Sequence, residues 1–374
     1  MQFKRLSKED LSDILYGCTI LGTGGGGELD EGFNYINKAF DAGKEFKLID
    51  FDHVPDNAKI CTPYMLGAIS DLSAEEEQEY SELPQSGEPS IMTALRRLEQ
   101  LTGDSYFGTI CCELGGSNTA ISFYVAAMSN GYIIDADPAG RAVPEITHST
   151  YYLNNLPAAP IVAANEFGEC FVCENVKDDM RAERLVRALA KVSRNDIAAI
   201  DHATEAKNLR GAVIQGTIST ALELGKAYRL AKADGSDIAQ VIADKGNGYV
   251  AFRGKTQNFN FETKDGFTLG YIEIEGVNNF EGDTYSIDVK NENMLARKNG
   301  VIDVTIPELI CCIDLDKGEP ITNPNHLVGM NVAVIILPAP KEFLTEKGLK
   351  AFGPAYLGLA DEYFSAVEKH FKQY

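Results

Sequence analysis

The sequence predicts an α/β N-terminal domain with a parallel βαβ unit and a glycine-rich loop, followed by a β-rich α+β C-terminal domain. Three observations carry this prediction. Between residues 109 and 137 an apolar run, a glycine turn, a helical pattern and a second apolar run follow one another, which is the order of a βαβ unit. Five glycines fall within residues 22–27. From Tyr249 onward strand patterns dominate, with Asp-Gly and Asn-Gly pairs that suit hairpin turns.

The first elements follow from capping residues and apolar spacing. Ser7, with Asp10 three residues later, resembles a helix cap, and apolar residues at helical intervals follow as far as Leu21. The glycine loop ends this helix. The elements expected next are a helix over 29–42, strands over 46–51 and 58–62, a solvated acidic loop over 74–90 and a helix over 91–101.

The βαβ unit contains a strand over 109–112, a helix over 119–129 and a strand over 132–134, and its two strands should be parallel. Around residue 158 the character of the chain changes. The later elements expected are a hairpin turned at 166–168, helices over 182–192 and 218–233, hairpins turned at 265–266 and 299–300, a strand over 331–337 and a helix over 361–371.

The chain of 374 residues is strongly acidic, with 55 Asp and Glu against 34 Lys and Arg and a net charge of −21. Such a surface repels nucleic-acid phosphates and anionic membranes, so neither is expected as a partner. The N-terminus has no apolar signal core, and no apolar run approaches the ~20 residues that span a bilayer. We therefore expect a cytoplasmic protein, and the eight cysteines do not suggest a disulfide framework.

Acidic residues follow both strands of the βαβ unit. Glu113 comes after the first strand, and Asp135 and Asp137 come after the second. Because neighbouring parallel strands lie about 4.8 Å apart and ligands collect at their carboxyl ends, we expect these carboxylates to converge on one small ligand or on a shared divalent metal ion. The turn at 115–118 opens the helix, where backbone N–H groups and the helix dipole favour an anion or oxyanion.

Further charged residues follow the second strand closely. Arg141 and Glu145 lie in one short segment, and His148 comes soon after, which makes a plausible clamp and acid/base set. The alternative is that Asp135 and Asp137 only cap turns and that Arg141 only pairs with them. The pattern leaves both interpretations open.

The glycine loop at 22–27 does not fit a nucleotide site. It lacks the Lys-Ser/Thr ending of a P-loop, and no strand precedes it, as the dinucleotide fingerprint requires. It is either a turn that needs positive φ or a wall whose bare amides approach a ligand closely. Five glycines favour the wall, because a simple turn does not need so many.

Three other features favour structural roles. Cys112 adjoins Glu113, but its apolar setting suggests a buried, inert thiol. His202 ends an apolar run and could reach a cleft, although a hydrogen-bonded structural histidine is the better expectation. The segment 291–293 reads as an ordinary turn between two strands.

Together these motifs resemble one bacterial family. The segments that carry the resemblance are LGTGGGG at 21–27, ELGGSN at 113–118, DADPAGRAVPE at 135–145, GFTLGYIEIEG at 266–276, KNENMLA at 290–296, and IPELICCID with GEPIT between 306 and 322. They are similar to S-methyl-thiohydantoin desulfurases, long classed as a domain of unknown function beside hydantoinase/oxoprolinase genes. The resemblance covers nearly the whole chain and implies two domains, 1–165 and 166–374. The acidic 74–90 segment departs from it.

The resemblance implies a hydrolytic site built from its shared motif positions. These positions are Gly24, Gly25, Gly26, Gly27, Glu113, Asn118, Asp135, Asp137, Arg141 and Glu145. The reaction it implies replaces sulfur by water at C2 of a five-membered thiohydantoin ring, giving a hydantoin and a thiol.

Each residue then has an expected role in this reaction. Asp135 or Asp137 activates the water, directly or through a divalent metal ion shared with Glu113. The loop amides and Asn118 hold the ring. The remaining expected roles are substrate carboxylate or oxyanion binding by Arg141, orientation of Arg141 by Glu145, and proton donation by His148.

Other functions stay open at this point. A covalent route through Cys112 is a second choice. The protein could instead be a non-catalytic ligand-binding or accessory subunit of a hydantoinase/oxoprolinase-type system, or a hydrolase of a related cyclic amide. The partners expected are a small-molecule substrate, further copies of the chain in a homo-oligomer, and a hydantoinase-type protein.

Overall fold

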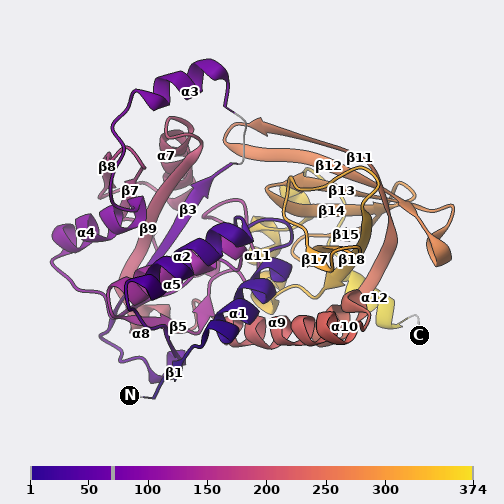
Figure 1. The fold of residues 1–374 in the computed structure, drawn as a ribbon, viewed down its shortest axis with the longest axis horizontal. Helices are drawn as coiled ribbons and strands as arrows, with labels where there is room; N and C mark the ends of the chain where they lie inside the picture. Colours follow the sequence, from indigo (N-terminus) through magenta and orange to yellow (C-terminus); the bar gives the residue numbers. More distant parts are fainter. Residues whose placement is uncertain (1, 69–71, 373–374) are drawn as a thin grey trace.

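The computed structural model describes residues 2–68 and 72–372 and contains two domains (Figure 1). An α/β domain with parallel strands comes first in the chain, and a β-rich domain follows. Over these residues the strands form two eight-stranded sheets and one two-stranded ladder. This arrangement agrees with the predicted α/β domain followed by a β-rich domain.

The first sheet has parallel strands at its centre and antiparallel strands at its edges. Its parallel strands are β2, β5, β4 and β3, whereas β1 and the run β9, β7, β8 are antiparallel to their neighbours. In spatial order the strands are β1 (Lys4–Arg5), β2 (Lys47–Ile49), β5 (Tyr132–Ile134), β4 (Gly108–Thr109), β3 (Lys59–Gly67), β9 (Asp196–Glu205), β7 (Ile161–Ala164) and β8 (Cys170–Cys173).

Helices cover both faces of this sheet. One face packs against α4 and α5, with α1 and α2 outside them, and the other face packs against α7. The helices of this part are α1 (Lys8–Leu21), α2 (Leu29–Asp41), α3 (Ala74–Ser81), α4 (Ser90–Thr102), α5 (Gly116–Met128), α6 (Thr150–Leu153), α7 (Asp179–Lys191) and α8 (Ala206–Leu209).

The local predictions for this domain are largely confirmed. Ser7 and Asp10 form a reciprocal capping box at the start of α1. Strands β4 and β5, which α5 connects in the sequence, pair directly and in parallel, with Gly108 opposite Tyr132. The boundary expected near residue 165 falls between β7 and β8, inside the first sheet.

The acidic segment 74–90 is not wholly a loop, which corrects the prediction. Its first part forms α3, because the Ser73 hydroxyl accepts from the Glu76 amide while the Glu76 carboxylate accepts from the Ser73 amide. The acidic first turn also complements the positive end of the helix dipole. The remainder of the segment is irregular.

The second sheet is antiparallel throughout. Its strands in spatial order are β15 (Val301–Thr305), β14 (Glu292–Lys298), β13 (Thr284–Lys290), β12 (Phe267–Gly276), β11 (Tyr249–Lys264), β18 (Asn331–Leu337), β16 (Leu309–Asp314) and β17 (Glu319–Pro320). Both predicted hairpin turns are confirmed, with positive φ at Asp265, Gly266, Asn299 and Gly300. The accompanying helices are α9 (Thr217–Asp234), α10 (Ile238–Lys245), α11 (Glu346–Ala351) and α12 (Ala366–Lys372).

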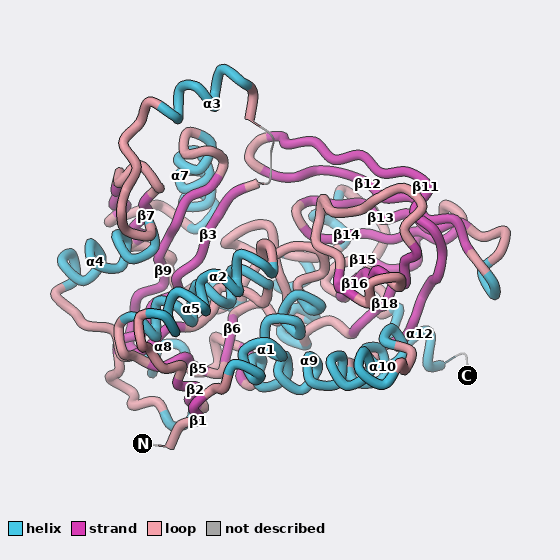
Figure 2. The backbone as a smooth tube through the Cα atoms, viewed as in Figure 1, coloured by secondary structure: helices cyan, strands magenta, loops and turns pink. Residues whose placement is uncertain are grey.

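Two features join the domains. Helices α1 and α9 cross so closely that a Cβ at Gly17 would lie 1.9 Å from the Ala221 carbonyl oxygen. The long β11–β12 hairpin reaches from the second sheet toward the first domain (Figure 2). At its tip the carbonyl of Gly266 accepts a 2.7 Å hydrogen bond from Arg187 of α7. The two domains are therefore tied at both ends of their contact.

Among residues 2–68 and 72–372, no helix combines the length and the apolar character that crossing a bilayer requires.

Candidate active site

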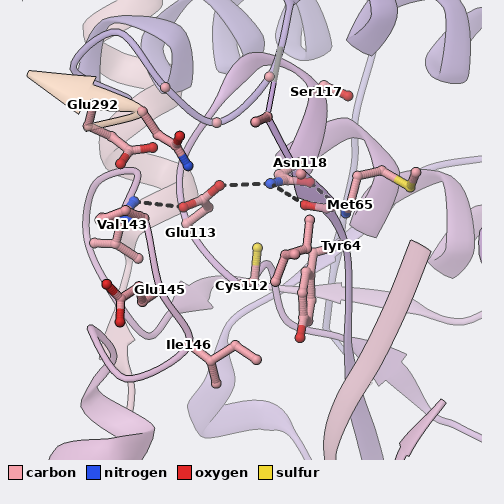
Figure 3. Close-up of a pocket in the computed structure, with 18 of the residues that line it drawn as sticks. Tyr64, Met65, Cys112, Glu113, Ser117, Asn118, Val143, Glu145, Ile146 and Glu292 are labelled. Atoms are coloured by element: carbon pink, nitrogen blue, oxygen red, sulfur yellow. Dashed lines mark hydrogen bonds between the residues drawn. The ribbon is translucent and has the colours of Figure 1, made fainter. Parts of the chain in front are cut away.

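A cavity of about 330 Å³ lies between the two domains. The glycine loop at 24–27, the end of β3 and residues 112–118 line it from the first domain, and residues 291–292 and 322–323 line it from the second. Figure 3 shows part of this lining, with Glu113 at its centre. The volume lies in the range of small-molecule sites, which is about 300–1,000 Å³.

Glu113 is held in a fixed position at the cavity wall. Its Oε1 accepts a 2.7 Å hydrogen bond from Asn118 Nδ2, and its Oε2 accepts a 2.7 Å hydrogen bond from the Val143 amide (Figure 3). Asn118 is itself fixed, because it bonds both the amide and the carbonyl of Met65 in β3. Burial raises the pKa of Glu113 to about 7, although both hydrogen bonds act to lower it. At neutral pH this carboxyl can therefore donate or accept a proton.

The glycine loop makes room for side chains from the second domain. A Cβ at Gly24 would lie 2.5 Å from Asn323 Nδ2, and a Cβ at Gly25 would lie 2.1 Å from Glu292 Oε1. These contacts explain two of the glycines without reference to a ligand.

The rest of the loop meets the start of α5 in the same way. A Cβ at Gly26 would lie 2.5 Å from the Gly115 Cα, and a Cβ at Gly27 would lie 2.5 Å from the Ser117 Cβ. The loop thus lines the cavity, as the wall interpretation requires, and it also lets the two domains approach each other.

Glu292, at the start of β14, faces the same region as Glu113 (Figure 3). Burial, followed by the nearby Glu113 carboxyl, raises the pKa of Glu292 well above its ordinary range. Its Oε2 is buried and has no hydrogen-bond partner among the described residues. Two neighbouring carboxyls whose pKa values are raised by burial thus line the cavity.

A second polar group borders the cavity at β9. Asp201 accepts hydrogen bonds of 2.8 Å from Tyr64 OH and 2.8 Å from His202 Nδ1, so its two oxygens serve different partners. With the proton on Nδ1, His202 Nε2 is left as an acceptor, and within the described chain it has no partner. The Tyr151 ring stacks on the imidazole at 4.2 Å. Positive φ at His202 (46°) marks a backbone strain of the kind that clusters at functional sites.

Cys112 also lines the cavity. Burial raises the pKa of its thiol well above the ordinary value, and the Glu113 carboxyl adds to this effect. A covalent route needs the thiolate, so the environment of Cys112 disfavours that route.

Arg141 does not face the cavity, contrary to the expected substrate-binding role. Its side chain is fully buried, and its donors serve protein oxygens from four segments of the chain. The acceptors are Ala142 O, Pro307 O, Glu308 O, Thr23 Oγ1 and Asn293 O. A guanidinium has five N–H groups, and here each has a protein acceptor. The arginine therefore fixes the glycine loop against the second domain.

Asp135 and Asp137 also lie outside the cavity lining. Asp135 accepts from the amide (3.0 Å) and hydroxyl (2.5 Å) of Ser219 in α9. Asp137 lies in β6 (Ala136–Asp137), which pairs with β10 (Ile214–Gln215), and it accepts from the amides of Ala139 and Gly140. The alternative in which both residues cap turns describes this geometry.

Glu145 lines the cavity, whereas His148 does not. Glu145 accepts from Lys290 Nζ (2.7 Å) and Tyr356 OH (2.5 Å), so it pairs with Lys290 and not with Arg141. His148 is buried against the rings of Phe352 and Tyr356. Burial lowers the pKa of His148 to about 3, so at neutral pH the imidazole carries no extra proton to donate.

The donor set does not fit the expected metal site. Glu113, Asp135 and Asp137 each have separate hydrogen-bond partners, and only Glu113 lines the cavity. Within 2–68 and 72–372, no group of three or more His, Cys, Asp or Glu side chains is placed to hold a metal ion. We therefore derive no step through a metal ion.

Sequence reasoning missed several residues of this cavity. Asp201 and His202 end an apolar run, which is a recognisable signal, but the pattern alone favoured a structural histidine. Glu292 and Asn323 gave no such signal, because their place at the cavity depends on how the two domains pack. Tyr64 and Tyr151, which also line the cavity, were not singled out in the sequence.

Two family models match the chain. The model of the S-Me-THD-like N-terminal domain covers residues 9–175, and that of the S-Me-THD-like C-terminal domain covers residues 177–366. These matches confirm the family resemblance. A crystal structure of a protein from Chromobacterium violaceum is similar to this chain with a TM-score of 0.74 and 23% identity, over 96% of this chain and 99% of that chain. At this identity the likeness shows the fold alone. A search of curated proteins finds no match.

Proposed function

Because the chain belongs to the S-Me-THD-like family, we propose that it is a hydrolase that removes a thiol from an S-methyl-thiohydantoin or a closely related five-membered cyclic amide. One observation carries the proposal. Burial raises the pKa of the Glu113 carboxyl to about 7, and Glu113 lines the same cavity as His202, whose Nε2 has no partner among the described residues. A proton donor and a proton acceptor that line one cavity are what this hydrolysis needs.

The proposed reaction begins with attack of water on C2 of the ring. His202 Nε2 takes one proton of the water as its oxygen bonds to C2, and Asp201 stabilises the resulting imidazolium through Nδ1–H. The electrons of the C2=N bond move to the ring nitrogen, which takes the proton of Glu113. Asn118 and Val143 hold the Glu113 carboxylate that remains.

Collapse of the tetrahedral adduct then releases the thiol. The hydroxyl proton on C2 passes to Glu113, the C2–S bond breaks, and the imidazolium of His202 gives its proton to the departing sulfur. The products are a hydantoin and methanethiol, so water supplies one oxygen to C2 and one proton each to nitrogen and sulfur. Both side chains return to their starting forms.

Release of methanethiol from S-methyl-thiohydantoin propionate by the purified protein tests this proposal. We expect His202→Gln to lower kcat by about 100-fold or more, in line with the loss of a general base. His148→Gln is the matched control, because it removes a buried histidine outside the cavity, and its rate should stay close to that of the wild type.

Two results would contradict the proposal. A His202→Gln rate equal to that of the wild type would remove His202 from the reaction. A wild-type protein that binds the ring and releases no thiol, with or without a hydantoinase-type partner, would favour the accessory ligand-binding role instead.

A further inference from the structure

Glu292 is buried in the second domain without the partners that a buried carboxyl normally has. Its side chain is 2% exposed, and among the described residues its Oε2 makes no hydrogen bond. Burying a polar group without a hydrogen bond is costly, so the position calls for an explanation.

The side-chain amides near Glu292 donate to protein acceptors. The Asn293 amide donates to Thr23 O at 2.8 Å, and Asn293 Nδ2 donates to Ile310 O at 2.9 Å. Asn323 Nδ2 donates to Asn291 O and to Asn293 Oδ1. The amide donors of Asn293 and Asn323 thus tie β14 to its surroundings, whereas Glu292 Oε2 has no partner among the described residues.

Gly25 leaves the space that the Glu292 carboxyl occupies. Only glycine fits at position 25, because a Cβ there would lie 2.1 Å from Glu292 Oε1 and 2.7 Å from Glu292 Cδ. Two other buried polar atoms of residues that line the cavity, Ser117 Oγ and Asn323 Oδ1, also lack partners within the described chain. Unpaired atoms gathered around one cavity indicate groups that a ligand completes.

We infer that Glu292 is a ligand-contact residue, supplied by the second domain, that hydrogen-bonds the polar edge of the bound ring. The chemistry that it recognises is a cyclic amide, because a neutral carboxyl offers an O–H donor and a C=O acceptor on one side, as a cis amide offers C=O and N–H. The two groups complement each other in a pair of hydrogen bonds. The inference rests on the proposed function for the identity of the ring.

Replacing Glu292 by leucine separates a ligand contact from a structural role. Removing an unpaired buried carboxyl should leave the melting temperature unchanged or raise it, because no protein hydrogen bond is lost at Oε2. The Kd for hydantoin-5-propionate, measured by calorimetry, should rise by about 10-fold or more, since a lost bond to a buried group costs about that factor or greater. Glu292→Gln keeps a donor and an acceptor, so its Kd should rise less than that of Glu292→Leu.

The outcomes decide between the two roles. A lower melting temperature with an unchanged Kd in Glu292→Leu, or an unchanged Kd in both variants, would overturn the inference. If Glu292→Leu does not fold, Glu292→Gln serves as the test. Its Kd for hydantoin-5-propionate is compared with its Kd for the ring N-methylated analogue, and the same ratio is measured for the wild type. The wild type should bind the analogue more weakly, and the variant should discriminate less.

Different results would overturn the proposed function and the inferred contact of Glu292 with the ligand. A wild-type protein that binds hydantoin-5-propionate through Glu292 but releases no thiol from the thiohydantoin would overturn the proposed hydrolysis and leave the contact in place. Thiol release at the wild-type rate and KM by Glu292→Leu would overturn the contact and leave the hydrolysis in place.

Discussion

Glu113 and Asp137 differ in their surroundings although they follow neighbouring parallel strands and are both buried. Burial raises the pKa of each to about 7. Asp137 accepts from amides two and three residues later in its own turn. Glu113 accepts from Asn118 and from Val143, 30 residues away in the sequence, and it lines the cavity. The comparison teaches that a carboxyl with a raised pKa marks a candidate site only when it also lines a cavity.

Arg141 joins the two regions, and its removal should have the largest effect. Its carbonyl accepts from the Leu114 amide beside Glu113, and its side chain serves five protein oxygens. Arg141→Met leaves several buried carbonyls without donors, which should lower the free energy of unfolding by about 4 kcal/mol. Urea denaturation measures this loss.

The control for Arg141 is a surface arginine. Arg96→Met removes an exposed ion pair with Glu88, which should cost less than about 1 kcal/mol. Similar losses in the two variants would mean that the buried guanidinium does not hold the strand ends together.

Glu113→Gln should lower the rate of thiol release much more than Asp137→Asn does. The amide cannot exchange the proton that the proposed reaction needs, so kcat for thiol release should fall by about 100-fold. Asp137→Asn keeps an oxygen that accepts from Ala139 and Gly140, and its kcat should stay within about 3-fold of the wild type. Equal losses in both variants would show that the cavity does not distinguish these residues.

Glu113 and Asp137 should affect the pH dependence of the unfolding free energy in the same way. In the folded protein the pKa of each is raised to about 7, whereas the ordinary values are 4.5 for Glu113 and 3.8 for Asp137. Their stabilising contribution is therefore complete below about pH 4 and is lost as the pH rises to 7, because the folded state retains protons that the unfolded chain releases.

Unfolding experiments at pH 5 and pH 7.5 measure this effect. Glu113→Gln and Asp137→Asn should each reduce the loss of unfolding free energy between these two values by at least about 1.4 kcal/mol. An unchanged difference in either variant would mean that the carboxyl in question is ionised in the folded protein at pH 5.

Asp135→Asn should have the smallest effect. Asp135 bonds only the start of α9 and lies outside the cavity lining, and its replacement keeps an acceptor for Ser219. The rate of thiol release should remain within about 2-fold of the wild type. A decrease in this rate of 10-fold or more would mean that Asp135 takes part in the reaction. The functional difference between the residues after the two strands would then be wrong.

Much of the fold could be predicted because its signals are local. The cap at Ser7, the βαβ unit and the turns at Asp265–Gly266 and Asn299–Gly300 depend on residues close in sequence. The first part of 74–90 was predicted wrongly because charge was given more weight than the capping box at Ser73 and Glu76. Membership of β9 in the first sheet depends on pairing with distant β3, which spacing alone does not reveal.

The candidate site could be predicted only in part for the same reason. Glu113 was expected from the βαβ unit, Asn118 from the family resemblance and the glycine loop from its composition, and all of them line the cavity. Arg141 was expected either to bind the substrate or to pair with Asp135 and Asp137, and only tertiary packing shows that carbonyls occupy its donors. Glu292 comes from a turn with no chemical signature and reaches the cavity only because Gly25 leaves room for it.

The hydrogen bond from Asn325 Nδ2 to Glu28 Oε1 has a consequence for synthesis and folding, because it joins residues 297 positions apart. The wall formed by the glycine loop leaves the ribosome long before its counterpart at residues 291–292 and 322–323. Contacts of such long range are formed late, since the loop they close must first lose its freedom. A nascent or truncated chain that stops before residue 291 therefore lacks the part of the cavity wall formed by residues 291–292 and 322–323, and the gain of affinity for the ring during refolding would report the completion of the cavity.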